Sequence, residues 1–120
     1  MPRFVVLQHD SPRGLHWDFM LEHGGVLKTW ALSRAPDAAP EQTAEALADH
    51  RLHYLDYEGP VFGTRGTVHR WDQGDYALDQ QIADQWHVLL KGKFLRGPLV
   101  LTRLLDSPSQ WQFKFGNVVA

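Results

Sequence analysis

The chain has 120 residues, a formal net charge of −2 and 43% hydrophobic residues. This length predicts a single domain over residues 1–120, and the slightly acidic balance argues against a broad electrostatic clamp on a nucleic-acid duplex. The chain has no cysteine, which excludes disulfides and thiolate zinc sites, so a metal ion would need His, Asp, Glu or carbonyl ligands.

The apolar residues form only short runs. The N-terminal segment lacks the long apolar run of a signal peptide, and no stretch approaches the roughly 18 apolar residues of a membrane-spanning helix. We therefore expect a cytoplasmic protein.

The first third of the chain is typical of strands joined by tight turns. Three strands are predicted here, over residues 3–9, 15–22 and 26–33. Ser-Pro-Arg-Gly and His-Gly-Gly are the turns between them, because Pro and Gly favour turn conformations. In the second strand, alternation places His16, Asp18 and Met20 on one face of the sheet.

The remaining residues predict one helix and further strands. Residues 41–49 are rich in Ala, Leu and Glu and predict a short helix, capped by Asp37 with Pro40 in its first turn. Residues 51–59 are expected to be extended. Further strands are predicted around a hairpin at Gln73-Gly74, on both sides of a basic turn in residues 91–97, and over residues 111–115.

Some seven or eight short strands with frequent turns favour a mainly β fold. We expect a compact β-barrel or sandwich of short antiparallel strands with one short helix.

The His-x-Asp pair formed by His16 and Asp18 is the strongest local signal of a site. In a strand both side chains project from one face, about 6–7 Å apart at Cα, and one ion can then take a nitrogen and an oxygen ligand. His9 on the preceding strand would supply a third ligand, which leaves open positions on a divalent ion. The alternative is a His–Asp hydrogen bond on a polar sheet face.

His50 and Tyr54 form a second candidate pair, four residues apart. Histidine can donate or accept a proton near neutral pH, and a tyrosine hydroxyl can donate to a phosphate oxygen. The alternative is a solvated helix end, where the helix dipole favours His50.

Two basic segments are weaker candidates for anion contacts. Lys91, Lys93 and Arg96 surround Phe94 in a predicted hairpin turn, a combination that can hold a nucleic-acid strand but also occurs simply for solubility. Arg65 lies in a Gly-rich turn that would let the backbone approach a phosphate. Four other histidines have no partner pattern and are expected to be structural or exposed: His23, His53, His69 and His87.

Taken together, these segments resemble the 3′-phosphoesterase domain of bacterial DNA ligase D. The most specific are FVVLQHDSPRGLHWDFMLEHGGVLKTWAL and ADHRLHYLDYEG. Weaker ones are GTVHRWDQGDY, LLKGKFLRGPLVLTRL and WQFKF. The resemblance covers nearly the whole chain.

The resemblance implies a compact β-barrel that binds manganese and acts on DNA 3′ ends. Such domains remove a 3′-terminal ribonucleoside and then the 3′-phosphate. The metal-binding residues of the family fall on His9, His16 and Asp18, and its phosphate-contacting pair falls on His50 and Tyr54.

The chain departs from the family pattern at two positions. Met20 and Gln42 stand where the family has arginines that contact the scissile phosphate. A bidentate guanidinium is not replaced by a thioether or an amide.

Three functions follow from these features. The first is a Mn²⁺-dependent phosphoesterase for the 3′ ends of nucleic acids, acting in DNA repair, with a separately encoded ligase or polymerase as a possible partner. The second is a non-catalytic, metal-containing module that binds nucleic-acid ends or repair proteins, and the third is a hydrolase of a small phosphoester.

Overall fold

The computed structural model describes residues 2–63 and 65–116. These residues form nine strands and a single 3-10 helix. The elements are β1 (Arg3–Ser11), β2 (Gly14–His23), β3 (Val26–Leu32), β4 (Glu41–His50), η1 (Leu52–Leu55), β5 (Gly59–Pro60), β6 (Thr67–Ile82), β7 (Gln85–Gly92), β8 (Arg96–Arg103) and β9 (Gln110–Phe115).

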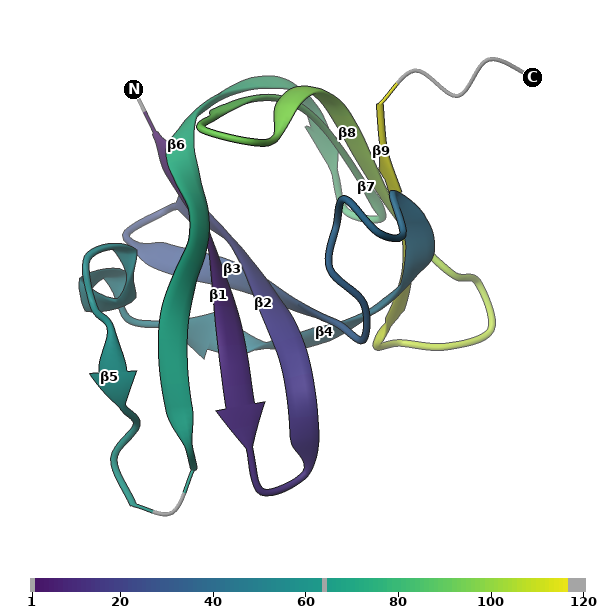
Figure 1. The fold of residues 1–120 in the computed structure, drawn as a ribbon. Helices are drawn as coiled ribbons and strands as arrows, with labels where there is room; N and C mark the ends of the chain where they lie inside the picture. The colour runs from purple at the N-terminus through teal and green to yellow at the C-terminus, as the bar shows by residue number, and fades with distance from the viewer. Residues whose placement is uncertain (1, 64, 117–120) are drawn as a thin grey trace.

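One antiparallel sheet closes on itself in a barrel-like ring (Figure 1). Its strand order is β1-β2-β3-β4-β9-β8-β7-β6-β5, and β1 pairs with β6 as well as with β2. The mainly β fold predicted from the sequence is confirmed. So are the β1–β2 and β2–β3 hairpins, the strands β7 and β8 around the basic turn, and the last strand β9.

The core has two parts because β1 is buried on both faces. Phe4 and Val6 join the larger cluster, which includes Trp30, Trp86 and Trp111. Trp30 packs edge-on against Trp86 and Trp111 with ring centroids 5.9 and 5.6 Å apart, a geometry that aromatic quadrupoles favour.

The smaller cluster lies on the opposite face of β1 and β2. It comprises Val5, Leu7, Met20, Leu27, Leu55, Val61 and Val68. Residues of η1 and of the chain just after β5 cover this cluster. The cluster provides the apolar surface beside the candidate site.

The predicted helix over residues 41–49 is wrong, because this segment is strand β4. An isolated helix of this length is marginal in water, whereas β4 gains ladder hydrogen bonds to β3 and β9. Its small residues also suit the sheet: Ala46 lies opposite Trp30 and Ala44 opposite Trp111. Asp37 and Pro40 lie in the loop before the strand, and neither begins a helix.

Two further predictions are corrected. The segment expected to be extended after β4 contains η1, whose Leu55 is buried under the sheet. The predicted hairpin at Gln73-Gly74 does not exist, because β6 runs through it, pairing first with β1 and then with β7. A Cβ on Gly74 would lie 2.2 Å from the Lys91 carbonyl oxygen, so this glycine allows the close approach of two strands.

No helix within the described residues is long and apolar enough to cross a membrane.

Candidate metal centre and adjoining cleft

The β1–β2 hairpin brings three potential metal ligands together. His9 and His16 are direct cross-strand partners, and Asp18 follows two residues further along β2 on the same face. Ligand atoms of His9, His16 and Asp18 all lie within 4.8 Å of one another. The structure thus brings together the three residues expected from the sequence, while the binding of a metal stays a prediction.

Asp18 is a nearly fully buried carboxylate, with 3% of its surface exposed. Its Oδ2 lies 3.1 Å from His9 Nδ1, and its Oδ1 lies 3.0 Å from His16 Nε2. Within the described residues Oδ1 nevertheless has no hydrogen bond of good geometry. Burying a carboxylate whose oxygen lacks a hydrogen bond costs free energy unless a positive charge lies beside it.

Both ring nitrogens of His9 face hydrogen-bond acceptors. Its Nε2 lies 2.7 Å from the Arg65 carbonyl oxygen, and its Nδ1 faces the Asp18 carboxylate. Both neighbours only accept hydrogen bonds, and a neutral imidazole has a single N–H to donate. A cation between Nδ1 and the Asp18 carboxylate would satisfy both groups.

His16 completes the centre from the other side of the carboxylate. The close polar contact with the negatively charged Asp18 carboxylate, although not a hydrogen bond of good geometry, raises the pKa of His16 against the opposing effect of burial. The His9 and His16 rings lie 4.6 Å apart, so both point toward the same small region.

The donor set fits a divalent metal ion. Two imidazoles and one carboxylate form a mixed nitrogen and oxygen set that suits Mn²⁺, Fe²⁺ or Zn²⁺ and leaves coordination positions open. The unsatisfied Asp18 oxygen and the two acceptors around His9 are the features that such an ion would satisfy.

A cleft of about 670 Å³ opens beside this centre. His9, Asp18 and Met20 form part of its wall. The other side is formed by the end of β4, by η1 and by the segment between β5 and β6. His16 is not among the described residues that line the cleft, so the three ligands lie at its edge.

His50 and Tyr54 line the same cleft as His9 and Asp18. The His50 ring nitrogen Nδ1 lies 2.9 Å from the Ala48 carbonyl oxygen, which can only accept, so Nδ1 carries the proton. The other nitrogen, Nε2, is then the one that can serve a ligand. The Tyr54 ring lies 5.8 Å from His50, edge-on.

Three cleft residues were not singled out as a site by the sequence pattern. His53, predicted to be structural or exposed, stacks against Tyr54 at 4.1 Å, and Tyr57 lies 5.8 Å from Tyr54. Arg51 lines the cleft directly after His50. No local pattern marks these residues, because only the turn of η1 places them on the cleft.

The two departures from the family pattern lie in different places. Met20 is 1% exposed and lies against the cleft. Gln42 instead bonds the preceding loop, donating from Nε2 to the carbonyl oxygens of Arg34 and Ala39 and accepting from the Arg34 N–H. It is absent from the described cleft wall.

The fold and the site define a small barrel-like domain with a cluster of two histidines and one aspartate at the edge of an aromatic cleft. Residues 7–103 match the family model described as the DNA ligase D 3′-phosphoesterase domain. The chain belongs to this family, which confirms the resemblance found in its sequence.

Sequence similarity to curated relatives supports the same family assignment. The chain is 33% identical over 133 residues to the multifunctional non-homologous end joining protein LigD of Pseudomonas aeruginosa, with 91% of this chain and 14% of that protein covered. It is 38% identical over 86 residues to the multifunctional non-homologous end joining DNA repair protein LigD of Mycobacterium tuberculosis, with 64% and 11% covered. The chain thus spans about a seventh of these relatives, or less.

Proposed function

We propose that this domain is a metal-dependent phosphoesterase that processes nucleic-acid 3′ ends by removing a 3′-phosphate or a 3′-ribonucleoside. The observation that carries the proposal is the cluster of His9, His16 and the buried Asp18 at the edge of the cleft that also contains His50 and Tyr54. Membership of the 3′-phosphoesterase domain family supports the substrate class.

His9, His16 and Asp18 would hold a divalent ion, for which we propose Mn²⁺. A bound ion of this kind would supply positive charge that stabilises a phosphate as its P–O bond breaks. The carboxylate of Asp18 orients both imidazoles, and burial keeps water from competing for it.

His50 is proposed as the proton donor. Because its Nδ1–H is held by the Ala48 carbonyl, a protonated Nε2 can donate to a phosphate oxygen and, as water attacks phosphorus, to the leaving oxygen. That oxygen is the strand's 3′ oxygen when phosphate is removed and the ribonucleoside's 5′ oxygen when a ribonucleoside is removed. The Tyr54 hydroxyl would donate to a second phosphate oxygen and fix the orientation of the group. The rings of His50 and His53 on either side hold Tyr54 in place.

Arg51 and Arg65 are proposed to supply the anion contacts that Met20 and Gln42 do not. Both line the cleft, and neither pairs with a carboxylate among the described residues. A guanidinium can bind a phosphate through two hydrogen bonds, which a thioether cannot.

In the cell, we propose a role in non-homologous end joining, the process for which the relatives are named. A ligase or polymerase would then act on the 3′-hydroxyl that this domain leaves.

The test is turnover of a primer–template that ends in a 3′-phosphate or in a single 3′-ribonucleotide. Product lengths and end groups are read on a denaturing gel, with Mn²⁺ or with a chelator. We expect His16→Ala and His50→Ala each to lower the rate by about 100-fold or more. His87→Ala is the matched control, because His87 contacts Gln85 on β7. Equal turnover in chelator, or in His16→Ala, would contradict the proposal.

A non-catalytic module that binds strand ends is the second candidate, favoured by the apolar Met20 in the cleft. Under this reading no variant shows turnover, and His50→Ala keeps its affinity for ends. A generic small phosphodiester in the same assay separates a hydrolase of small phosphoesters from one that needs a strand end.

A further inference from the structure

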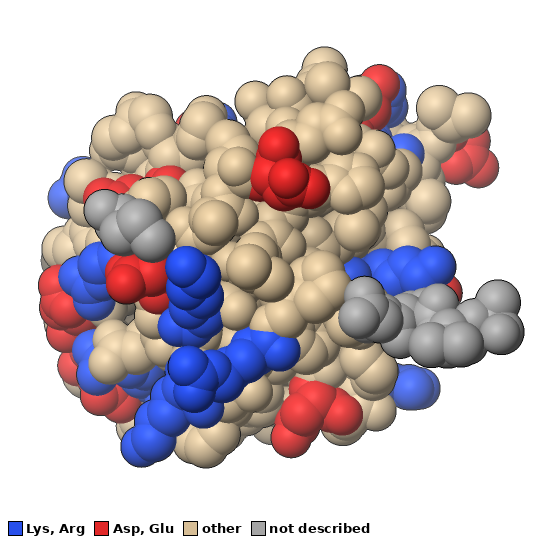
Figure 2. Space-filling view, turned by 90° about the horizontal axis from the view of Figure 1, so that it is seen from above, with Lys and Arg blue, Asp and Glu red and all other residues tan. Residues whose placement is uncertain are grey.

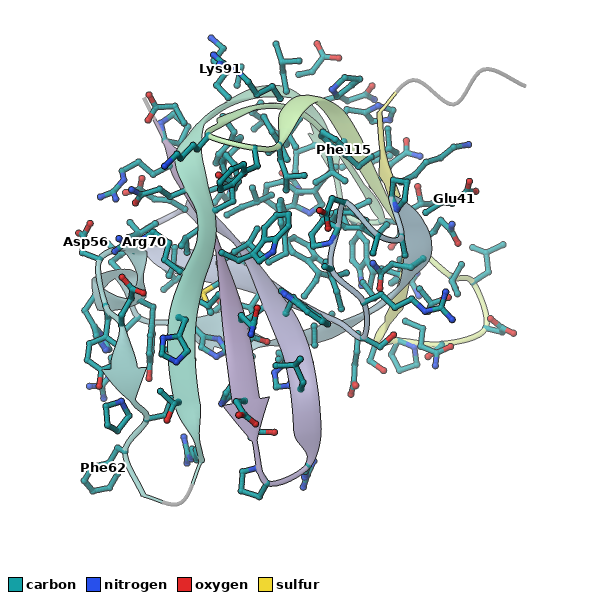
Figure 3. All side chains as sticks on the ribbon, in the orientation of Figure 1. Glu41, Asp56, Phe62, Arg70, Lys91 and Phe115 are labelled. Carbon is teal, nitrogen blue, oxygen red and sulfur yellow. The ribbon has the colours of Figure 1, made fainter. Side chains whose placement is uncertain are left out.

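A basic turn lies at the end of the molecule opposite the cleft. Lys93 lies in the turn between β7 and β8, with Lys91 near the end of β7 and Arg96 at the start of β8, and all three are exposed. Figure 3 places Lys91 at the top of the molecule, whereas Phe62, which lines the cleft, lies at the bottom. Figure 2 views the end that carries Lys91 and shows Lys and Arg atoms gathered over one side of it.

These cations form no ion pairs with carboxylates of the described residues. Asp75 is the cross-strand partner of Lys91, yet the two side chains form no salt bridge there. Arg3 and Arg70, by contrast, both pair with carboxylates. The turn thus concentrates free positive charge in a chain of net charge −2.

An exposed aromatic ring lies among these cations. Phe94 is 64% exposed, with Lys93 Nζ 5.6 Å from its ring centroid and the Trp71 ring 6.1 Å away. Exposure of a phenyl ring is unfavourable in the free protein and is recovered when the ring stacks on an apolar partner.

The turn is held rigid from beneath by one buried carboxylate. Asp72 accepts backbone N–H bonds from Lys93, Phe94 and Leu95 at 2.8–3.2 Å. Its Oδ2 would lie 2.6 Å from a Cβ on Gly92, so only glycine there lets the turn close over the carboxylate. The cations and the ring are therefore preorganised, which lowers the entropic cost of binding.

We propose that the β7–β8 turn is a second nucleic-acid contact that binds a single-stranded segment remote from the processed end. Lys91, Lys93 and Arg96 contact its phosphates, and Phe94 stacks on an unpaired base, the combination that single-strand binding uses. This proposal depends on the proposed function in one respect, which is that the partner is a nucleic acid.

The experiment measures binding without catalysis. A fluorescein-labelled 20-nucleotide DNA strand with a 3′-hydroxyl is titrated with the full chain, without added metal, at several salt concentrations. We expect Lys91→Ala/Lys93→Ala to weaken binding about 10-fold and to reduce the slope of log affinity against log salt by about 1 to 1.5. Phe94→Ala should weaken binding about 10-fold without changing this slope.

The matched control is Arg34→Ala/Lys114→Ala, which removes the same charge elsewhere from cations that pair with no carboxylate among the described residues. An equal loss of affinity in this control, or no loss in the turn variants, would overturn the proposal. Equal or tighter binding of a blunt duplex by the wild type would overturn the stacking role of Phe94. A thermal melt confirms that each variant is folded.

Failure of this proposal can be distinguished from failure of the proposed function. Absence of turnover in the 3′-end assay rejects the proposed function but leaves the binding data intact. Conversely, turnover of a substrate only two or three nucleotides long should be unchanged in Lys91→Ala/Lys93→Ala, whereas turnover of a long strand at low concentration should fall.

Discussion

Asp18 and Asp72 are both buried strand aspartates, with 3% and 2% of their surfaces exposed, but their surroundings are opposite. Asp72 accepts four backbone N–H bonds, from Gln73, Lys93, Phe94 and Leu95. Asp18 faces two imidazoles, and among the described residues its Oδ1 lacks a hydrogen bond of good geometry.

The difference separates a carboxylate that shapes the backbone from one that we propose to bind a metal ion. Backbone amides satisfy a carboxylate permanently and cannot leave, so the charge of Asp72 is used to shape a turn. Imidazoles can release their protons and accept a metal ion instead, so the charge of Asp18 is available to a ligand.

The largest expected effect is on stability, from Asp72→Ala. Removing this carboxylate leaves four backbone donors without their acceptor, and we expect the free energy of unfolding to fall by about 3–4 kcal/mol. Urea denaturation measures it. Asp72→Asn, which keeps one acceptor oxygen, should lower the free energy of unfolding by less than Asp72→Ala does. A loss under about 1 kcal/mol for Asp72→Ala would show that water replaces the carboxylate.

The next effect concerns metal affinity, from Asp18→Ala. We expect Mn²⁺ binding to weaken by more than about 100-fold, because losing even an outer-shell partner of a metal ligand costs 10- to 100-fold. Without metal, this variant should lose less stability than Asp72→Ala, because it removes a poorly compensated buried charge. Calorimetric titration gives the affinity, and an unchanged value would remove Asp18 from the metal site.

The smallest effect appears only at alkaline pH and involves Tyr76. Burial, together with the nearby charge of Glu22, raises the pKa of Tyr76 to about 12, and its hydroxyl donates to the Glu22 carbonyl at 2.7 Å. Because the pKa is higher in the folded state, this stability is present below pH 10 and is lost as pH rises from about 10 to 12. Tyr76→Phe should flatten that part of the stability–pH curve. An unchanged slope would show that Tyr76 ionises normally, and Mn²⁺ binding should be the same in both proteins.

Strands with strong local patterns were predictable from the sequence. β2 alternates polar and apolar residues between two glycine-containing turns, so its pairing and the shared face of His16 and Asp18 follow from strand geometry. The metal candidates could be named for this reason, because they lie on two strands joined by a tight hairpin.

Elements whose conformation depends on distant partners were not predictable. β4 has helix-favouring residues, and its extended form is selected by β3 and β9. β6 continues through Gly74 because Lys91 on another strand approaches it there. The contribution of Arg51 and His53 to the cleft likewise depends on the turn of η1 and its packing against β1, which no local pattern encodes.

The most direct test of the proposed metal site identifies the atoms that hold Mn²⁺. Pulsed electron paramagnetic resonance of the Mn²⁺-loaded protein, with ¹⁵N-labelled histidine, detects nitrogen coupled to the ion. We expect coupling to the two imidazoles of His9 and His16, with one lost in His16→Ala and both retained in His87→Ala. Stoichiometrically bound Mn²⁺ without any imidazole coupling would contradict it.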